Sequence, residues 1–138
     1  MPVIDASVFV AIVNRADVHH DACRTWFEQA VNNGDRLLAP NILMSETAAA
    51  ISRGAGNEAL ARAIVTTLAA STVIELSPIG NSLAAAAAEI AATRRIRGCD
   101  AVYVALASSV DEALVTLDQQ QLTRSSGLIA VMSPSTDN

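Results

Sequence analysis

The chain has 138 residues, of which 51% are hydrophobic and only 3% aromatic, and its formal net charge is −5. This length and apolar content predict one folded domain and exclude a disordered segment. All nine basic residues are arginines. The absence of lysine excludes a P-loop, a Schiff-base enzyme and a phospho-receiver domain with a lysine beside its acidic pocket. The acidic balance argues against a broadly basic nucleic-acid-binding surface.

The cysteines and the N-terminal segment indicate the cellular environment. Cys23 and Cys99 are too few for a disulfide framework. The opening stretch MPVIDASVFV lacks the basic segment of a signal peptide and the long apolar span of a membrane helix. We therefore expect a soluble, reduced, cytoplasmic protein without membrane association.

Short apolar runs alternate with helical patterns along the chain. In chain order we predict a strand at 2–5, helices at 6–15 and 18–34, a strand at 36–40, helices at 41–54 and 57–71, a strand at 72–76, helices at 79–96 and 99–110, a strand at 112–118, a short helix from 118 to 126 and a strand at 128–132. This alternation is typical of an α/β three-layer sandwich with a mostly parallel central sheet. We assign residues 1–133 to a single domain and residues 134–138 to a C-terminal tail.

Acidic residues close two of the predicted strands. Asp5 ends the first strand, and Asp118 ends the strand that contains ALVTL. Ligands of open parallel sheets bind beyond the carboxyl ends of the strands, so these two carboxylates are expected to share one cleft. The alternative is that each acid only caps the helix that follows it.

Two further acids interrupt apolar helices. Glu46 is the only acid in NILMSETAAAISRG, and an acid on so apolar a face is costly unless it is paired or bound to metal. A surface pair with Arg53, two helical turns away, is the alternative. Asp100 lies in the first turn of its helix, where the helix dipole alone favours a carboxylate by roughly 0.3–1 kcal/mol.

The four acids Asp5, Glu46, Asp100 and Asp118 fit one hypothesis together, a divalent-metal site. Sites built from several carboxylates suit Mg²⁺ or Mn²⁺. Without a cation, the gathered carboxylates would repel one another and raise one another's pKa values. A bound cation removes that repulsion, orients a phosphate oxygen and lowers the pKa of a bound water.

Weaker patterns are better explained by structure than by chemistry. The stretch 54–59 matches the relaxed dinucleotide-binding pattern GxGxxA but follows a predicted helix, so we interpret it as a helix–helix turn. His19 and Cys23 are spaced for zinc but supply two ligands, whereas a structural site needs four. Arg94, Arg95 and Arg97 either complement a helix C-terminus or bind phosphates.

Four segments carrying these acids resemble, in order, the motifs of the PIN-domain family, and especially its VapC-like toxin ribonucleases. The segments are VIDASVFVA, APNILMSETAAAISR, RGCDAVYVALA and the stretch from Leu114 to Leu122. The resemblance covers nearly the whole chain. It implies a PIN-like fold with the acids clustered at the carboxyl ends of the strands.

The resemblance also implies cleavage of RNA phosphodiesters with Mg²⁺ or Mn²⁺, by in-line attack of water that leaves 5′-phosphate and 3′-hydroxyl ends. Asp5 and Asp100 would be the most direct metal ligands, and Glu46 and Asp118 would complete the pocket. Ser7 and Thr116 stand where the family often has supporting hydroxyls. Family members commonly form homodimers and are inhibited by a small antitoxin that also binds DNA.

The leading hypothesis is therefore a metal-dependent endoribonuclease, the toxin of a type II toxin–antitoxin pair, with Arg94, Arg95 and Arg97 as candidates for holding the RNA backbone. A non-catalytic partner-binding or regulatory module on the same fold is the first alternative, because alanine-rich helices suit close packing in a dimer. A metal-dependent phosphatase or DNase shares the acids and is the second alternative.

Overall fold

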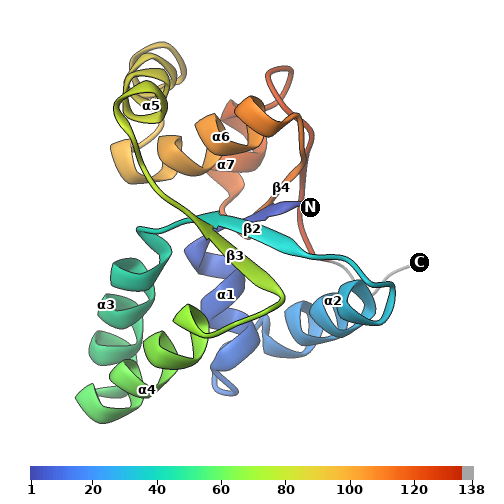
Figure 1. The fold of residues 1–138 in the computed structure, drawn as a ribbon, viewed down its shortest axis with the longest axis vertical. Coiled ribbons are helices and arrows are strands. Elements are labelled where there is room, and N and C mark those ends of the chain that lie inside the picture. Colours follow the sequence, from blue (N-terminus) through green and yellow to red (C-terminus); the bar gives the residue numbers. More distant parts are fainter. Residues whose placement is uncertain (135–138) are drawn as a thin grey trace.

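The computed structural model describes residues 1–134 and shows a parallel sheet between two layers of helices (Figure 1). The elements are β1 (Val3–Ile4), α1 (Ala6–Val13), α2 (His20–Asn32), β2 (Leu37–Pro40), α3 (Leu43–Ala55), α4 (Glu58–Ala69), β3 (Ile74–Ser77), α5 (Asn81–Arg94), α6 (Gly98–Val110), β4 (Leu114–Val115), α7 (Gln119–Arg124) and β5 (Val131–Met132). None of these helices is long and apolar enough to cross a membrane.

The sheet has the strand order β3-β2-β1-β4-β5, and each neighbouring pair is parallel. The prediction of a mostly parallel sheet is confirmed, and within residues 1–134 the sheet is wholly parallel. The chain winds outward from β1 through β2 to β3 on one side and through β4 to β5 on the other. The topological switch point therefore lies between β1 and β4, and a crevice is expected beyond their carboxyl ends.

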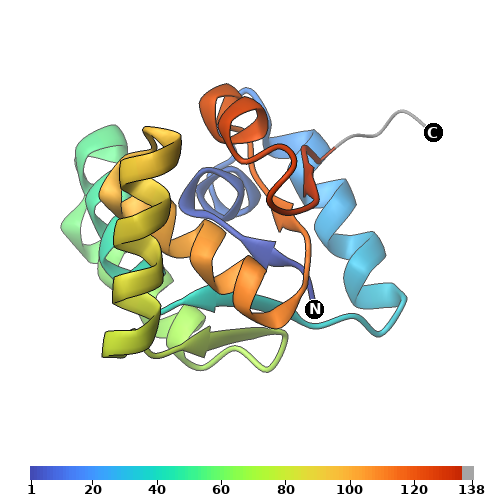
Figure 2. The ribbon, with the colours of Figure 1, turned by 90° about the horizontal axis from the view of Figure 1, so that it is seen from above.

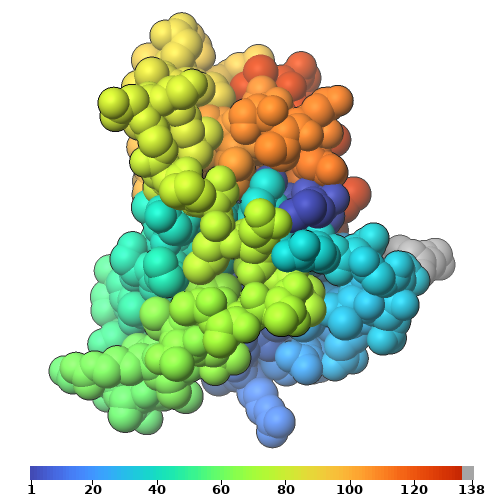
Figure 3. Space-filling view, viewed as in Figure 1, coloured from blue at the N-terminus to red at the C-terminus, as the bar shows by residue number. Residues whose placement is uncertain are grey.

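Helices α1 to α4 cover one face of the sheet, and α5 and α6 cover the other (Figure 1). Seen from above, α5 crosses the N-terminal part of α6 (Figure 2), and the two helices are in extensive contact. Helix α6 forms the inner part of this layer, since most of its residues from Asp100 to Ala107 are buried. Helix α5 lies along the outside of the molecule (Figure 3), and most of its alanines are exposed.

The centre of the sheet is strongly apolar because both faces are covered. Val3, Ile4, Leu114 and Val115 in the two central strands are completely buried. Such continuous apolar runs are typical of parallel strands packed on both sides. Because these strands are tightly packed, the backbone of Asp5, which follows β1, is held in a fixed position.

The predicted elements are all present, with some shorter than expected. The predicted strand 112–118 is shorter than expected, at Leu114–Val115. The backbone N–H of Thr116 still donates to Met132 of β5 at 3.0 Å, and Asp118 is already the N-cap of α7. The GxGxxA stretch is a helix–helix turn, as predicted, with Gly56 in the left-handed region at φ 62°. The predicted tail 134–138 lies outside the described residues except for Pro134.

Candidate active site

Asp5 leaves β1 directly into the crevice at the switch point, and its side chain is held by four donors. The backbone N–H of Val8 donates to Oδ1 at 3.2 Å, and the Ser7 hydroxyl donates to the same atom at 2.5 Å. Oδ2 accepts from the Thr116 hydroxyl and from Nε2 of Gln121 at 3.0 Å. Asp5 is only 3% exposed, so this network fixes one orientation of the carboxylate.

Burial raises the pKa of Asp5 above its ordinary value. The hydrogen bonds from Ser7, Thr116 and Val8 oppose the rise, and the negative charge of Asp100 adds to it. An ionised Asp5 therefore costs free energy in the metal-free protein. A cation near these carboxylates would offset that cost.

Glu46 reaches the site from α3, on the opposite side of the sheet from α6. Its Oε1 accepts a hydrogen bond from the hydroxyl of Tyr103, a completely buried side chain of α6. The pKa of Tyr103 is raised by burial and by the neighbouring Glu46 carboxylate, so the hydroxyl stays protonated and continues to donate at neutral pH. The alternative pairing of Glu46 with Arg53 is absent from the ion pairs within residues 1–134.

Asp100 lies in the first turn of α6 and is 8% exposed. Its Oδ2 accepts from Nε of Arg97 at 2.9 Å, and this contact raises the pKa of Arg97. Within residues 1–134, Oδ1 of Asp100 has no hydrogen-bond donor. One oxygen of a largely buried carboxylate is thus left for a cation or water.

Glu46, Asp100 and Cys99 form the group whose ligand atoms converge most clearly. One ligand atom from each lies within 4.8 Å of the others. Burial raises the pKa of the exposed Cys99 thiol, and the charges of Asp100 and Glu46 raise it further. A divalent cation fits this donor set, because it would neutralise two carboxylates that face each other across the crevice.

Asp118 caps α7, with its Oδ1 accepting from the backbone N–H of Gln120 at 2.8 Å. Its own backbone N–H donates to the hydroxyl of Thr116 at 3.0 Å, and that hydroxyl in turn donates to Asp5. Ser7 makes a matching link, since its hydroxyl accepts from the backbone N–H of Leu117 at 3.1 Å. Asp5 and Asp118 therefore do cap their helices, as the alternative predicted, and they also belong to one network.

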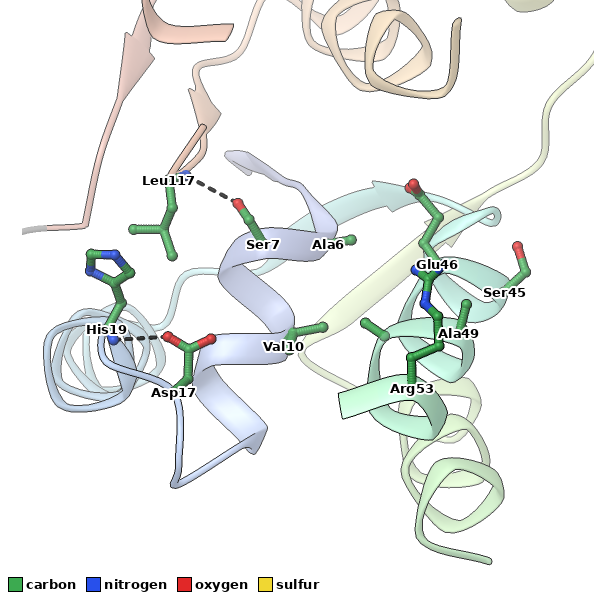
Figure 4. A pocket seen from close by; sticks show the side chains of 11 residues that line it. Ala6, Ser7, Val10, Asp17, His19, Ser45, Glu46, Ala49, Arg53 and Leu117 are labelled. Atoms are coloured by element: carbon green, nitrogen blue, oxygen red, sulfur yellow. Dashed lines mark hydrogen bonds between the residues drawn. The ribbon is translucent and has the colours of Figure 1, made fainter. Parts of the chain in front are cut away.

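A groove of about 560 Å³ opens beside the acids, between α1 and α3. Figure 4 shows its two sides, with Ser7, Ala6 and Val10 on α1 facing Glu46 and Arg53 on α3. The remaining lining residues are Asp17, His19, Ser45, Ala49, Ala50 and Leu117. The groove thus combines apolar side chains with an arginine and the Glu46 carboxylate, a mixed lining that can accept both the base and the phosphate of a nucleotide.

The three upstream arginines have different surroundings. Arg94 donates to the backbone carbonyls of Arg124 at 3.4 Å and Ser126 at 3.1 Å, so it ties α5 to the segment before β5. Arg97 is bound to Asp100, and its side chain remains 75% exposed. Arg95 ends α5 with φ 56°, and its carbonyl accepts from Arg124.

The zinc alternative at His19 and Cys23 is not supported. Cys23 is completely buried in the core, whereas His19 is exposed before α2. Within the part of the chain that the structure describes, the group of metal-ligating side chains is the one around Asp100.

Sequence analysis missed three residues of the site: Tyr103, Gln121 and Cys99. Tyr103 is three residues after Asp100, on the same face of α6, and this spacing is the one signal that could have indicated it. Gln121 is 2% exposed, but the run of three glutamines hides which one turns inward. Cys99 directly precedes Asp100, but its residue type and position in the sequence indicated only that two cysteines are too few for a disulfide framework.

The family model for the PIN domain matches residues 3–125. The chain therefore belongs to the PIN-domain family. No curated protein sequence matches it.

Several solved structures share this fold at low sequence identity. VapC20 of Mycobacterium tuberculosis, described as a sarcin–ricin loop cleaving toxin, has a TM-score of 0.77 at 19% identity, with 94% of this chain and 97% of that chain covered. VapBC2 of Rickettsia felis, bound to a promoter DNA fragment, has a TM-score of 0.73 at 12% identity over 95% and 96% of the two chains. FitAcB of Neisseria gonorrhoeae has a TM-score of 0.71 at 16% identity over 97% and 98%.

Proposed function

We propose that this chain is a divalent-metal-dependent endoribonuclease and the toxin of a toxin–antitoxin pair. The observation that carries the proposal is the convergence of Glu46 and Asp100 at the switch point, beside a buried Asp5 whose pKa Asp100 helps to raise. These acids come from β1, α3 and α6, and bringing them together without a cation costs free energy. The toxin assignment is supported by the PIN family match and by the fold shared with VapC20, which is described as a toxin.

In this proposal Asp100 and Glu46, with Asp5 and Asp118, hold Mg²⁺ or Mn²⁺ directly or through water. The cation would supply a polarised phosphate oxygen and a more acidic bound water. Ser7 and Thr116 hold the Asp5 carboxylate in one orientation by donating to its two oxygens, and these hydrogen bonds oppose the rise of its pKa. The result is hydrolysis that leaves a 5′-phosphate and a 3′-hydroxyl.

RNA would approach along the groove between α1 and α3, which is lined by Glu46 and by Ser7, the residue that donates to Asp5. Arg53 on the groove wall and Arg97 beside Asp100 are the arginines placed to bind phosphates next to the cleaved bond. Arg94 and Arg95 were expected in the same role, but Arg94 is engaged with backbone carbonyls. We therefore assign the phosphate contacts first to Arg53 and Arg97.

Asp5→Asn and Asp100→Asn test the proposal directly. Each variant should lose Mg²⁺- or Mn²⁺-dependent cleavage of structured RNA, while circular dichroism shows an unchanged fold. Asp111→Asn is the matched control, because Asp111 is an exposed acid at the other end of α6 in a left-handed conformation that asparagine also adopts. Wild-type rates in either site variant would show that the site is misassigned.

Parallel assays separate the remaining alternatives. Cleavage of DNA or of small phosphate esters in preference to RNA would make the chain a DNase or a phosphatase. A folded chain that binds no Mn²⁺ in calorimetry and cuts no RNA would favour the non-catalytic partner-binding module. We also propose a homodimer and a small DNA-binding antitoxin as partners, to be tested by light scattering and by co-purification with the product of a neighbouring short reading frame.

A further inference from the structure

We propose that Cys99 makes the acid pocket a site for thiophilic divalent cations of the zinc class, with Glu46, Cys99 and Asp100 as its protein ligands. The four-acid hypothesis contains no sulfur ligand. The inference rests on the proposed function in one respect: the hydrolytic metal is placed on the same two carboxylates. It goes further by naming a second class of cation that competes for them.

The positions of the three ligand atoms carry the proposal. They lie within 4.8 Å of one another. Around a tetrahedral zinc ion, with bonds of about 2.3 Å to sulfur and about 2.0–2.2 Å to oxygen, neighbouring ligand atoms lie roughly 3.5 Å apart. To reach this geometry from the observed spacing, the ligand atoms must move by about 1 Å, and rotation of the short, exposed Cys99 side chain can supply this movement.

The two carboxylates are already oriented for a ligand. Tyr103 donates to Glu46 and fixes it against α6. Asp100 is 92% buried, since its exposed fraction is 8%, and Arg97 binds only its Oδ2. Within residues 1–134, Oδ1 of Asp100 has no donor, so one oxygen of a carboxylate whose side chain is only 11% exposed is left open beside the thiol.

The chemistry of the third ligand decides which cation the set prefers. A thiolate is a soft ligand that selects zinc-like ions, whereas Mg²⁺ requires octahedral coordination by oxygen. Asp5 is less suited to the zinc set, because its two oxygens already accept four protein hydrogen bonds. Three protein ligands leave a fourth position on zinc for water or a phosphate oxygen.

Because both cations need Glu46 and Asp100, their binding is mutually exclusive. Zinc should therefore compete with Mg²⁺ or Mn²⁺ for the pocket. A chelator that removes zinc would reverse the competition, since coordination by these three side chains is reversible. The chain would then be held inactive whenever zinc-class ions are in sufficient supply.

Titration of the metal-free full chain with Co²⁺ tests the ligand assignment without any measurement of activity. Wild type should develop the near-ultraviolet charge-transfer band of a cobalt–thiolate bond. Cys99→Ser should lack the band, and its zinc affinity in calorimetry should fall by at least about tenfold. Cys23→Ala is the matched control, because it removes the other cysteine, which is buried, and should keep the band.

The absence of the band in wild type, or its persistence in Cys99→Ser, would overturn the inference. Glu46→Gln supplies a second check and should weaken zinc binding while retaining both thiols. The inference and the proposed function fail separately. A wild-type chain that cuts RNA with Mn²⁺ but shows no band overturns the zinc site alone, whereas one that shows the band but cuts no RNA supports the zinc site and overturns the ribonuclease.

Discussion

Replacing Tyr103 by phenylalanine should lower stability and metal affinity together. The Tyr103 hydroxyl lies in the core and donates to the Glu46 carboxylate from 57 residues away in the sequence. A hydrogen bond to a charged group contributes about 1.5–3 kcal/mol. Glu46 is only half-buried, so water recovers part of the loss, and we expect about 1.5 kcal/mol.

A double-mutant cycle isolates this contribution. The free energy of unfolding in urea would be measured for the metal-free wild type, Tyr103→Phe, Glu46→Ala and the double variant. The expected coupling energy between the two side chains is about 1.5 kcal/mol. A coupling below about 0.5 kcal/mol would refute the idea that the hydrogen bond contributes to stability.

The same variant separates positioning from simple structural support. If Tyr103 positions Glu46 for a cation, Tyr103→Phe should weaken Mn²⁺ binding by about 10–100-fold, as for other groups that orient a metal ligand. Calorimetry at a temperature where both proteins are folded measures this directly. Unchanged Mn²⁺ affinity with lowered stability would leave Tyr103 as a structural residue only.

Three further predictions concern charge and hydrogen bonding. Because burial raises the pKa of Asp5, the protein loses stability as the pH rises above the unfolded-state pKa of this group, and Asp5→Asn should stabilise the metal-free chain at neutral pH. Urea denaturation should show this gain shrinking as the pH falls towards about 4, the unfolded-state pKa, and a gain independent of pH would contradict the assignment. Gln121→Met removes the amide donor to Asp5 and should weaken Mn²⁺ binding by about tenfold in calorimetry, where wild-type affinity would exclude a positioning role. Arg94→Ala should cost about 1 kcal/mol of stability and leave the salt dependence of RNA binding unchanged. Arg53→Ala should instead reduce the slope of log affinity against log salt by about one. The reverse pattern would exchange the roles of the two arginines.

The fold could be predicted because it depends on local patterns. Apolar runs such as RLLAP and helical stretches such as NILMSETAAAISRG fix the type and order of the elements, and their alternation implies a parallel sheet. The strand order could not be predicted this way. It depends on which strands pair across long sequence distances, as Val3 does with both Leu38 and Leu114.

The residues of the candidate site likewise differ in whether the sequence reveals them. Asp5 and Asp118 could be found because a carboxylate after an apolar strand is visible in the sequence. Tyr103 and Gln121 are harder to find, because each acts on an acid more than 50 residues away. Only the spacing of Tyr103 from Asp100 hints at a role, and nothing distinguishes Gln121 from its neighbouring glutamines. The left-handed conformation of Arg95, which ends α5 just before Asp100, also follows no residue preference that a sequence reveals.

If the chain binds RNA as proposed, the arginines of this acidic chain limit how it can do so. Three of them pair with surface glutamates, and two donate to backbone carbonyls; these are Arg24, Arg36, Arg62, Arg94 and Arg124. If Arg53 and Arg97 are the main phosphate contacts, the slope of log affinity against log salt should be shallow, about −1 to −2. Such a small electrostatic contribution cannot support tight binding that is independent of RNA sequence and structure, and the net charge of −5 weakens such binding further. Selectivity would then come from the shape of the groove and from the proposed cation beside it, which favours a folded RNA that presents one phosphate to that cation.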